Sequence, residues 1–371
     1  MHPLDYKGCI FNALREVECM NVVEQYNLTL QIEVLKEQSA ETLARLCKLV
    51  DGSGTNDCVE ALKAYSHMVN TELYLATSIH ELDVLKSDMV KLENTIKASL
   101  AQASHEVSDV KANSGISDIE SYSSEDFDKA LARTIDLLTF NKNVSSTPHA
   151  VILGGQSGAG KTTIHRVKMM EYKGDYIVID GDTYRAQHPH FRELQEKYGV
   201  DSVDYTKAFA GQMVEAVIDK LSSLKYNLII EGTLRSAAVP INTATLLKSK
   251  GYTVDFCLIA TKPELSYLTT QLRYLEMMIV DPLQARATPK DHHDGIVKSL
   301  VSNCNELEQS GLFESIQVYK RDLEQVYNSK SCTESVGTVV EQILFGAWTQ
   351  DEAALLAVSK SQEDELRAKL P

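Results

Sequence analysis

Residues 154–163 read GGQSGAGKTT, and this stretch decides the fold class of the chain. It contains the pattern G-x-x-x-x-G-K-[ST], which runs from Gly155 to Gly160, Lys161 and Thr162. In this pattern the glycines let backbone N–H groups turn around phosphates, the lysine reaches the β and γ phosphates, and the hydroxyl holds Mg²⁺. We therefore predict a phosphate-binding loop (P-loop) that binds a nucleoside triphosphate.

The residues around the P-loop support this prediction. The apolar run 150–153 is typical of a buried strand, and residues 163–170 continue as a helix whose N-terminus favours anions. A glycine-rich turn with a chance lysine is the alternative, and these neighbours disfavour it. Thr162 is the predicted metal ligand. The predicted nucleotide-binding residues are Gly155, Gln156, Ser157, Gly158, Ala159, Gly160, Lys161, Thr162 and Thr163.

Strands and helices alternate from residue 125 onward. A helix is predicted at 126–140, before the P-loop. Apolar strands that end on polar residues are predicted at 176–180, 227–231, 254–260 and 315–319, with helical stretches between them. This alternation indicates an α/β fold with a doubly wound, mainly parallel sheet. Residues 350–370 are typical of a solvated helix packed on the domain edge.

The first hundred residues have a different pattern. Residues 22–103 contain no proline and almost no glycine, and their apolar residues recur with helical periodicity. Helices are expected at 28–49, 58–77 and 79–100, with a turn at 52–54. The last of these carries an apolar stripe made of Leu82, Leu85, Met89, Leu92 and Ile96. We predict a small all-helical bundle at 1–103, a linker rich in Ser, Asp and Glu at 104–124, and the P-loop domain at 125–371.

The composition narrows the function classes. The net charge of −15 disfavours a general nucleic-acid binder, which needs a basic face. The seven cysteines never stand in C-x-x-C spacing, which favours reduced thiols over a disulfide framework or a zinc site. The sequence shows neither a leader pattern nor an apolar run long enough to span a bilayer. We therefore expect neither secretion nor membrane insertion, and the predicted location is the cytoplasm.

Acidic residues follow two of the predicted strands. Asp180 and Asp182 stand in IDGD, and Glu231 stands in IEGT. Ligands of parallel α/β sheets bind at the carboxyl ends of the strands, where a carboxylate can accept a hydroxyl proton or coordinate Mg²⁺ through water. The alternative for Asp182 is to cap a helix that begins near Thr183. Because acids follow two strands of a chain with a P-loop, the functional role is favoured.

Other polar residues invite a chemical role. Arg273 and Arg286 lie in a helix-then-loop segment after the P-loop, where guanidinium groups of a mobile cover neutralise a transferred phosphoryl group. Surface ion pairs are the alternative for each arginine. No Asn-Lys-x-Asp box follows the P-loop, which disfavours a GTPase. A metal site is disfavoured at the histidine pairs because a plausible third ligand is missing; these pairs are His188 with His190 and His292 with His293.

From about residue 117 to residue 370, the chain closely resembles the zeta-toxin family, in particular its PezT-like branch. The resemblance rests on GGQSGAGKTTIHR (154–166), IDGD with QHPH (179–182 and 187–190), YNLIIEGTLR (226–235) and ARATPK (285–290). It implies a kinase that uses ATP and Mg²⁺ to phosphorylate the 3′-hydroxyl of UDP-N-acetylglucosamine. The resemblance further implies that the product would poison cell-wall precursor synthesis.

The resemblance also implies residue roles, position by position. Asp182 matches the general base that takes the proton of the sugar hydroxyl. The residues that match the sugar-nucleotide site are Asp182, Glu215, Glu231 and Thr233. The residues that match the phosphate-stabilising cations are Lys161, Arg273 and Arg286.

The N-terminal segment has a resemblance of its own. Over roughly residues 20–100 it resembles the toxin-binding half of the PezA-type antitoxin, through VEQYNLTLQIE (23–33), LARL (43–46) and NTELYL (70–75). The helix-turn-helix of that family has no counterpart, because only about twenty residues precede the match. DNA binding is therefore not expected.

These observations lead to one main hypothesis and two alternatives. The main hypothesis is a UDP-N-acetylglucosamine kinase inhibited by its own antitoxin-like domain, within one chain or between chains. The first alternative is a P-loop kinase of another small-molecule hydroxyl. The second is a nucleotide-sensing interaction module, which needs neither a base nor cover arginines. The sequence leaves open the oligomeric state and whether the fusion is natural or engineered.

Overall fold

The computed structural model describes residues 22–51, 55–104, 118–283, 285–322 and 324–370. These residues fall into two compact units. The first unit holds the described parts of 1–34, 144–179 and 222–371, and the second holds those of 35–143 and 180–221. Helix α2 (Val22–Val50) belongs to both units, because the boundary after residue 34 cuts through it.

The first unit contains the sheet. Its described residues form a six-stranded sheet in the order β2-β3-β1-β4-β5-β6. The strands are β1 (His149–Gly154), β2 (Ile177–Ile179), β3 (Leu228–Glu231), β4 (Thr253–Ile259), β5 (Ser315–Tyr319) and β6 (Gln325–Asn328). All neighbouring strands run parallel except β5 and β6. The predicted α/β fold with a mainly parallel sheet is confirmed, and the antiparallel strand β6 is an addition that the sequence patterns did not predict.

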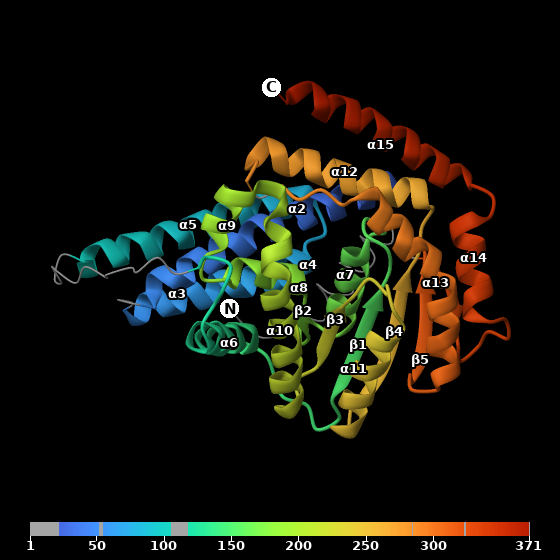
Figure 1. Ribbon diagram of the computed structural model, residues 1–371, viewed down its shortest axis with the longest axis horizontal. Helices are drawn as coiled ribbons and strands as arrows, with labels where there is room; N and C mark the ends of the chain where they lie inside the picture. The colour runs from blue at the N-terminus through green and yellow to red at the C-terminus, as the bar shows by residue number, and fades with distance from the viewer. Residues whose placement is uncertain (1–21, 52–54, 105–117, 284, 323, 371) are drawn as a thin grey trace. The chain divides into compact units, whose positions relative to one another are not determined.

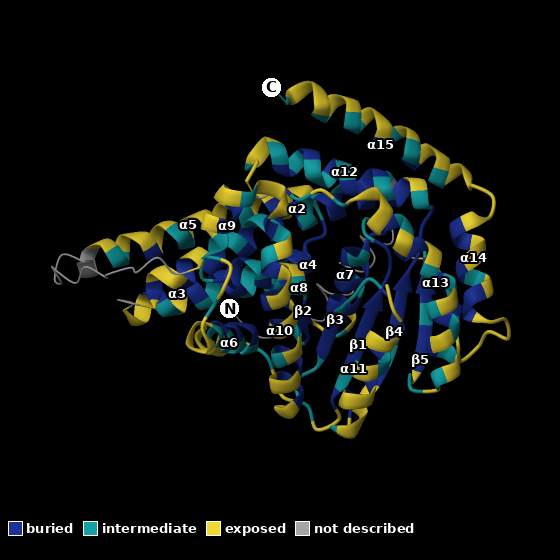
Figure 2. Cartoon of the chain, in the orientation of Figure 1, coloured by how far each residue is buried: buried dark blue, intermediate teal, exposed yellow. Residues whose placement is uncertain are grey.

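Register places the ends of the central strands side by side. Leu153 of β1 lies opposite Glu231 of β3 and opposite Cys257 of β4. Strands β1 to β5 are mostly apolar and buried over almost their whole length, as expected for a parallel sheet covered by helices (Figure 2). Residues that follow β1, β3 and β4 therefore meet at one edge of the sheet.

Among its described residues, the first unit holds six complete helices. They are α7 (Lys161–Glu171), α11 (Ala238–Ser249), α12 (Pro263–Val280), α13 (Lys290–Ser310), α14 (Val336–Phe345) and α15 (Gln350–Lys369). Helix α15 begins with a capping box in which Thr349 and Glu352 exchange hydrogen bonds. It lies along α12 and is mostly exposed, as predicted for the polar C-terminal helix (Figures 1 and 2).

The first half of α2 also packs in the first unit. Its Tyr26 and Leu30 form a buried apolar cluster with Leu265 and Leu272 of α12 and Leu355 of α15. Each side chain in this cluster is at most 4 % exposed. The helix expected at 28–49 is therefore part of a longer helix, and its first turns are packed between α12 and α15.

The second unit is helical. Besides the second half of α2 it holds α3 (Asn56–His67), a π-helical turn (Met68–Glu72), α4 (Leu73–Leu75), α5 (Ile79–Ser104), α6 (Ser124–Thr139), α8 (Gly181–Tyr184), α9 (Phe191–Tyr198) and most of α10 (Ser202–Ser223). Two 3₁₀ turns, Arg185–Gln187 and Gly199–Asp201, connect α8, α9 and α10. The predicted N-terminal helices are confirmed, and a break between α4 and α5 lies close to the predicted one. The predicted turn at 52–54 lies outside the described residues.

The apolar stripe of α5 is narrower in the structure than in the sequence pattern. Leu82, Met89 and Ile96, seven residues apart, are buried, while Leu85 and Leu92 are half-buried. Within this unit α5 packs on α3 and also meets α2, where Ser39 Oγ lies 3.9 Å from Met89 Sδ. The buried residues of α5 thus have the seven-residue spacing of a helix–helix seam.

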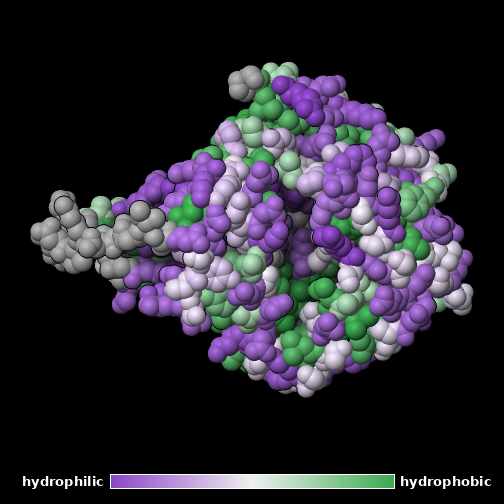
Figure 3. Space-filling model, in the orientation of Figure 1, coloured by the Kyte–Doolittle hydropathy of each residue, from purple (hydrophilic) through white to green (hydrophobic). Residues whose placement is uncertain are grey.

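The predicted linker at 104–124 lies largely outside the described residues. The described part from 118 to 123 leads into α6, where Ser123 and Asp126 form a capping box. The predicted domain bounds 1–103 and 125–371 follow sequence patterns and stay predictions, whereas the two units follow packing. Within the described ranges, no helix has the length and apolar character that crossing a membrane requires. Figure 3 shows mostly hydrophilic side chains on the face turned toward the viewer.

Candidate functional site

The P-loop joins β1 to α7 in the first unit. Its glycines adopt left-handed φ angles of +143° at Gly155, +73° at Gly158 and +100° at Gly160. A Cβ atom on Gly158 would lie 2.0 Å from the carbonyl oxygen of Ser266, and one on Gly155 would lie 2.5 Å from that of Ile259. Only glycine fits these two positions, because both the backbone angle and the space exclude a side chain.

The side chain of Gln156 fixes the P-loop from within. It is fully buried, and its Nε2 donates to the carbonyl oxygen of Thr261 at 2.7 Å and to Ser266 Oγ at 3.4 Å. Thr261 follows β4 and Ser266 lies on α12. The loop is thus tied to two neighbouring elements and holds its shape through these hydrogen bonds.

Lys161, the first residue of α7, points toward the end of β3. Its Nζ lies 3.6 Å from Glu231 Oε1 and 3.5 Å from the carbonyl oxygen of Gly155. The buried His165, one turn further along α7, places Nε2 at 3.3 Å from Glu231 Oε2. The structure therefore brings together Lys161 and Glu231, two predicted site residues, and adds His165. Thr233, also predicted, is half-buried two residues beyond β3.

Arg321 is a site residue that sequence reasoning missed. It follows β5 and is 8 % exposed, and its guanidinium group donates to the carbonyl oxygens of Gly158 and Ala159 and to Thr269 Oγ1 of α12. Burial lowers the pKa of Arg321 from its usual value. The only signal in the sequence is a single arginine after a strand, which gains meaning once β5 is placed two strands from the P-loop.

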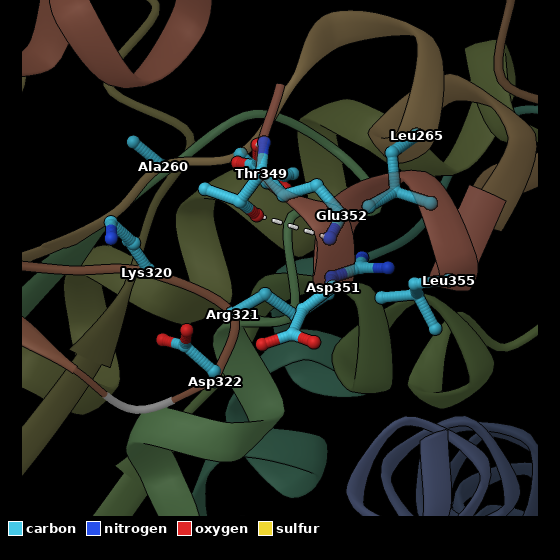
Figure 4. A pocket seen from close by; sticks show the side chains of 10 residues that line it. Ala260, Leu265, Lys320, Arg321, Asp322, Thr349, Asp351, Glu352 and Leu355 are labelled. Atoms are coloured by element: carbon cyan, nitrogen blue, oxygen red, sulfur yellow. Dashed lines mark hydrogen bonds between the residues drawn. The ribbon is translucent and has the colours of Figure 1, made fainter. Parts of the chain in front are cut away.

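A pocket lies beside Arg321 at the ends of β4 and β5 (Figure 4). The N-terminal turn of α15 forms one of its walls, and the dashed line in Figure 4 marks the bond from the Glu352 amide to Thr349 Oγ1. Both acidic and basic side chains line it. Its lining residues are Ala260, Thr261, Leu265, Lys320, Arg321, Asp322, Thr349, Asp351, Glu352 and Leu355.

The first half of α2 contacts the nucleotide-binding residues of the first unit. Thr29 Oγ1 lies 3.2 Å from Thr163 Oγ1, in the first turn of α7. The ring of Tyr26 lies under the Arg321 guanidinium, with 5.0 Å between its carbon Cζ and the ring centre. Residues 26, 29 and 33 share one face of a helix, because they are three and four positions apart.

The predicted cover arginine Arg273 contacts α2, and the segment that carries Arg286 does so beside it. Glu33 Oε2 lies 3.9 Å from Arg273 Nη1, and both side chains are largely buried. Arg286 is half-buried, and its neighbour Ala285 packs against Val34 and Met277. The stripe on α2 that begins with Tyr26 and Thr29 therefore continues to both arginine-bearing segments.

The second unit holds the predicted general base. Helix α8 begins at Gly181, and the cap is Asp180, whose Oδ1 accepts from the backbone N–H of Asp182 at 3.0 Å. The capping role considered for Asp182 thus falls to Asp180, since the helix starts two residues earlier than expected. Asp182 is exposed and pairs with Arg185, Oδ1 to Nε at 2.9 Å.

Glu215 lies on the neighbouring helix α10 and is exposed. The residue before it, Val214, approaches Gly181 so closely that a Cβ on the glycine would be 3.1 Å from its Cγ2. The segments that carry Asp182 and Glu215 are therefore packed together in the second unit. The predicted site residues of the first unit are Lys161, Glu231, Thr233, Arg273 and Arg286.

The second half of α2 binds the acidic strand end through charged groups. Lys36 Nζ lies 2.5 Å from Asp180 Oδ2, and the two side chains are 8 % and 14 % exposed. Lys48 Nζ donates to the carbonyl oxygens of His188 and Pro189 at 3.0 and 3.1 Å. Burial lowers the pKa of Lys48 from its usual value.

The histidines are placed differently from one another. His188 and His293 are fully buried, and burial lowers the pKa of His188 to about 4 and also lowers that of His293. His190 is half-buried and His292 is exposed. Within the part of the chain that the structure describes, no group of three His, Cys, Asp or Glu side chains is arranged to hold a metal ion.

Two known protein families match different parts of the chain. The profile of the family described as "Zeta toxin" matches residues 135–331. The profile described as "Bacterial epsilon antitoxin" matches residues 24–99, which include most of α2, all of α3 and most of α5.

Individual proteins give the same picture. The chain is 56 % identical over 252 residues to "Toxin PezT" of Streptococcus pneumoniae serotype 4, across 68 % of this chain and all of that protein. It is 41 % identical over 214 residues to "Toxin zeta" of Streptococcus pyogenes, across 58 % of this chain and 75 % of that protein. It is 29 % identical over 90 residues to "Antitoxin PezA" of the same pneumococcal serotype, across 23 % of this chain and 57 % of that protein.

A solved structure supports the fold. It comes from a characterisation of the PezAT chromosomal toxin–antitoxin system of Streptococcus pneumoniae, and it superposes with a TM-score of 0.63 at 51 % identity. The similarity covers 68 % of this chain and all of that chain.

Proposed function

Because the chain belongs to the zeta-toxin family and carries an antitoxin-like segment, we propose that it is a kinase held inactive by its own N-terminal helices. The proposed reaction is transfer of a phosphoryl group from ATP to the 3′-hydroxyl of UDP-N-acetylglucosamine, in the cytoplasm. One observation carries the proposal: a complete P-loop begins α7, and an antitoxin-like helix places Thr29 within 3.2 Å of the hydroxyl of Thr163 in that first turn.

The residues of the first unit fit ATP and Mg²⁺. Three glycines hold the left-handed angles that direct backbone N–H groups toward phosphates, and α7 presents its N-terminus to the loop. Lys161 would hold the terminal phosphates, and the Thr162 hydroxyl would hold Mg²⁺. When bound, ATP supplies the phosphoryl group and Mg²⁺ neutralises part of its charge. Arg321 and Gln156 would keep the loop in shape.

The proposed acceptor site combines residues implied by the family. Asp182 would accept the proton of the sugar hydroxyl while that oxygen attacks phosphorus. Its exposed carboxylate pairs with Arg185 at 2.9 Å. Glu215, Glu231 and Thr233 would bind the sugar nucleotide.

The proposed phosphate-stabilising cations have acidic partners in this structure. Lys161 lies beside Glu231, and Arg273 lies beside Glu33 of α2. Arg273 and Arg286 would neutralise charge on the transferred group. Because Glu33 occupies Arg273, the antitoxin-like helix would have to leave before Arg273 serves a phosphate.

The inhibition follows from what α2 covers. Tyr26, Thr29 and Glu33 contact Arg321, the start of α7 and Arg273 in the first unit, and Lys36 neutralises Asp180, two residues before the proposed base, in the second. The helix thus engages the proposed donor and acceptor groups separately. We propose that it competes with nucleotide binding rather than distorting the sheet.

The proposal is tested by measuring ATP consumption with UDP-N-acetylglucosamine. The full chain should be nearly inactive, a chain beginning at Asp118 should be active, and residues 1–104 added separately should restore inhibition in proportion to their concentration. Equal rates with and without the N-terminal helices would overturn self-inhibition. Rapid phosphorylation of another hydroxylated compound, with UDP-N-acetylglucosamine inert, would favour the alternative of a different small-molecule kinase. ATP binding without any transfer would favour a nucleotide-sensing module.

A further inference from the structure

His293 occupies an unusual position in the first turn of α13. Residues 285–289, here called the arginine loop because they carry Arg286, lead directly into this helix. The His293 side chain is fully buried, whereas the adjacent His292 is exposed. His293 Nε2 lies 2.8 Å from Ser266 Oγ of α12, and its Nδ1 lies 3.2 Å from Asp294 Oδ1.

The partners define the hydrogen bonds of the ring. A carboxylate can only accept, so His293 Nδ1 carries the proton and donates to Asp294. In the neutral ring Nε2 is then an acceptor, and Ser266 Oγ donates to it. Burial lowers the pKa of His293, which favours this neutral form. The carbonyl oxygen of Pro263, 3.0 Å from Ser266 Oγ, is the other possible acceptor for that hydroxyl.

Ser266 connects the ring to the P-loop in two ways. Its hydroxyl oxygen lies 3.4 Å from Gln156 Nε2, which donates to it. Its carbonyl oxygen lies against Gly158, at the point where any side chain on that glycine would collide. A continuous line of contacts therefore runs from the start of α13 through Ser266 to two residues of the P-loop.

We infer that His293 is a positioning residue that anchors the arginine loop to the P-loop through Ser266. The anchor fixes the end of the arginine loop where it enters α13. At its other end, Ala285 is buried against Met277 and Val34. Arg286 thus lies between two fixed points, and its reach toward the P-loop is limited. Any consequence for turnover rests on the proposed kinase function, whereas the anchor itself does not.

The anchor is tested with the full chain and trypsin. Cleavage after Arg286 requires the arginine loop to open, so its rate reports the population of the open form. The four variants are His293→Ala, His293→Gln, His293→Asn and the matched control His292→Ala. A glutamine amide reaches the position of Nε2 and can accept from Ser266, whereas an asparagine amide reaches only that of Nδ1.

His293→Ala and His293→Asn should speed cleavage after Arg286 about tenfold, the size expected for one lost buried hydrogen bond. His293→Gln and His292→Ala should stay within about twofold of the unmodified chain. Cleavage after the exposed Arg235, in the same unit, is the reference site and should not change. Equal acceleration at both arginines would mean that His293 only stabilises the fold, and would overturn the anchor.

A second measurement tests whether His293 acts on the P-loop through Ser266. Ser266→Ala should accelerate cleavage after Arg286 as much as His293→Ala does, and the double variant should add little to either. Hydrogen exchange of the P-loop amides should rise in the same variants. Additive effects, or unchanged P-loop exchange, would show that the two residues act separately and would overturn the inference. Neither readout needs a substrate, so a failure of the proposed kinase function leaves this test intact.

Discussion

The two halves of α2 bind their surroundings by different means. In the first unit, Tyr26 and Leu30 enter an apolar cluster, and the one ion pair described above, Glu33 with Arg273, is long at 3.9 Å. In the second unit, Lys36 and Lys48 make short contacts with Asp180 and with backbone carbonyl groups. Apolar burial supplies most of the free energy of an interface, while charged pairs select the register. The comparison suggests that the first half holds the helix in place and the second half sets its position.

The largest expected effect is on turnover, and it distinguishes Asp182, the proposed base, from Asp180, the carboxylate that α2 binds. Asp182→Asn in a chain beginning at Asp118 should lower turnover about 10²-fold or more, because the hydroxyl proton loses its acceptor, while ATP binding stays intact. The matched variant is Asp180→Asn, which keeps a good helix cap but loses the charge that Lys36 binds. It should leave turnover of the shortened chain far less affected and should weaken inhibition in the full chain. Similar turnover for the two variants would contradict the role given to Asp182.

The next largest effect should come from the apolar side chains in the first half of α2, which hold this helix in the first unit. Leu30 is 4 % exposed in its cluster, and Leu30→Ala should cost about 2–3 kcal/mol of the packing that holds α2. ATP consumption by the full chain should rise accordingly and should change little with added salt. Leu49 on the same helix is 47 % exposed, and Leu49→Ala serves as the control. If both variants stay equally inactive, the apolar half does not hold the helix.

Low pH should lower the stability of the second unit, which the second half of α2 contacts at His188. The pKa of buried His188 is lowered to about 4, against about 6.5 in the unfolded chain, so the unfolded state binds the extra proton. This contribution to stability is complete above pH 6.5 and is lost as the pH falls toward 4. Between pH 7.5 and pH 5 the loss should be about 2 kcal/mol in the free energy of unfolding of the second unit.

Denaturant unfolding followed by hydrogen exchange of 180–221 measures this loss. His188→Gln removes the titrating group and should flatten the dependence on pH in that range. An unchanged slope in the variant would assign the acid sensitivity to other groups.

The smallest expected effect on inhibition comes from an exposed ion pair in the second half of α2. Glu41 Oε1 lies 2.8 Å from Arg192 Nη1, but the arginine side chain is 52 % exposed. Exposed pairs of this kind contribute about 0–1 kcal/mol, so Glu41→Gln should change inhibition by less than about fivefold. A much larger effect would mean that position-setting in the second half extends beyond Lys36 and Lys48.

Local patterns predicted most of the fold. The P-loop, four further strands and the N-terminal helices follow from glycine spacing and apolar periodicity, which act over short stretches of chain. Strand β6 was missed because Gln325–Asn328 is short, lies at the edge and is mostly polar. The alternative considered for Asp182, a helix cap, falls to Asp180, because Asp180 precedes the helix by one residue and takes that role.

Contacts between distant segments could not be predicted in the same way. Arg321 serves the P-loop from about 160 residues away, and Lys36 meets Asp180 across a similar interval. Each is an ordinary charged residue in its local sequence, and each becomes informative only when burial forces it to find a partner. The roles of Glu215, Glu231, Thr233 and the two arginines rest on the family resemblance and stay proposals.

The cluster that holds the first half of α2 joins the beginning of the chain to its end. Leu355 of α15 completes this cluster, so the full seat of the helix exists only after α15 has been synthesised. Proteins are synthesised at about 5–20 residues per second, so roughly 10–40 s separate Lys161 from Leu355. A ribosome that stops before α15 would release a chain with P-loop and arginines but without the full seat for its inhibitor. Under the proposed self-inhibition, the inhibitory helix is therefore fully held only once α15 has been synthesised.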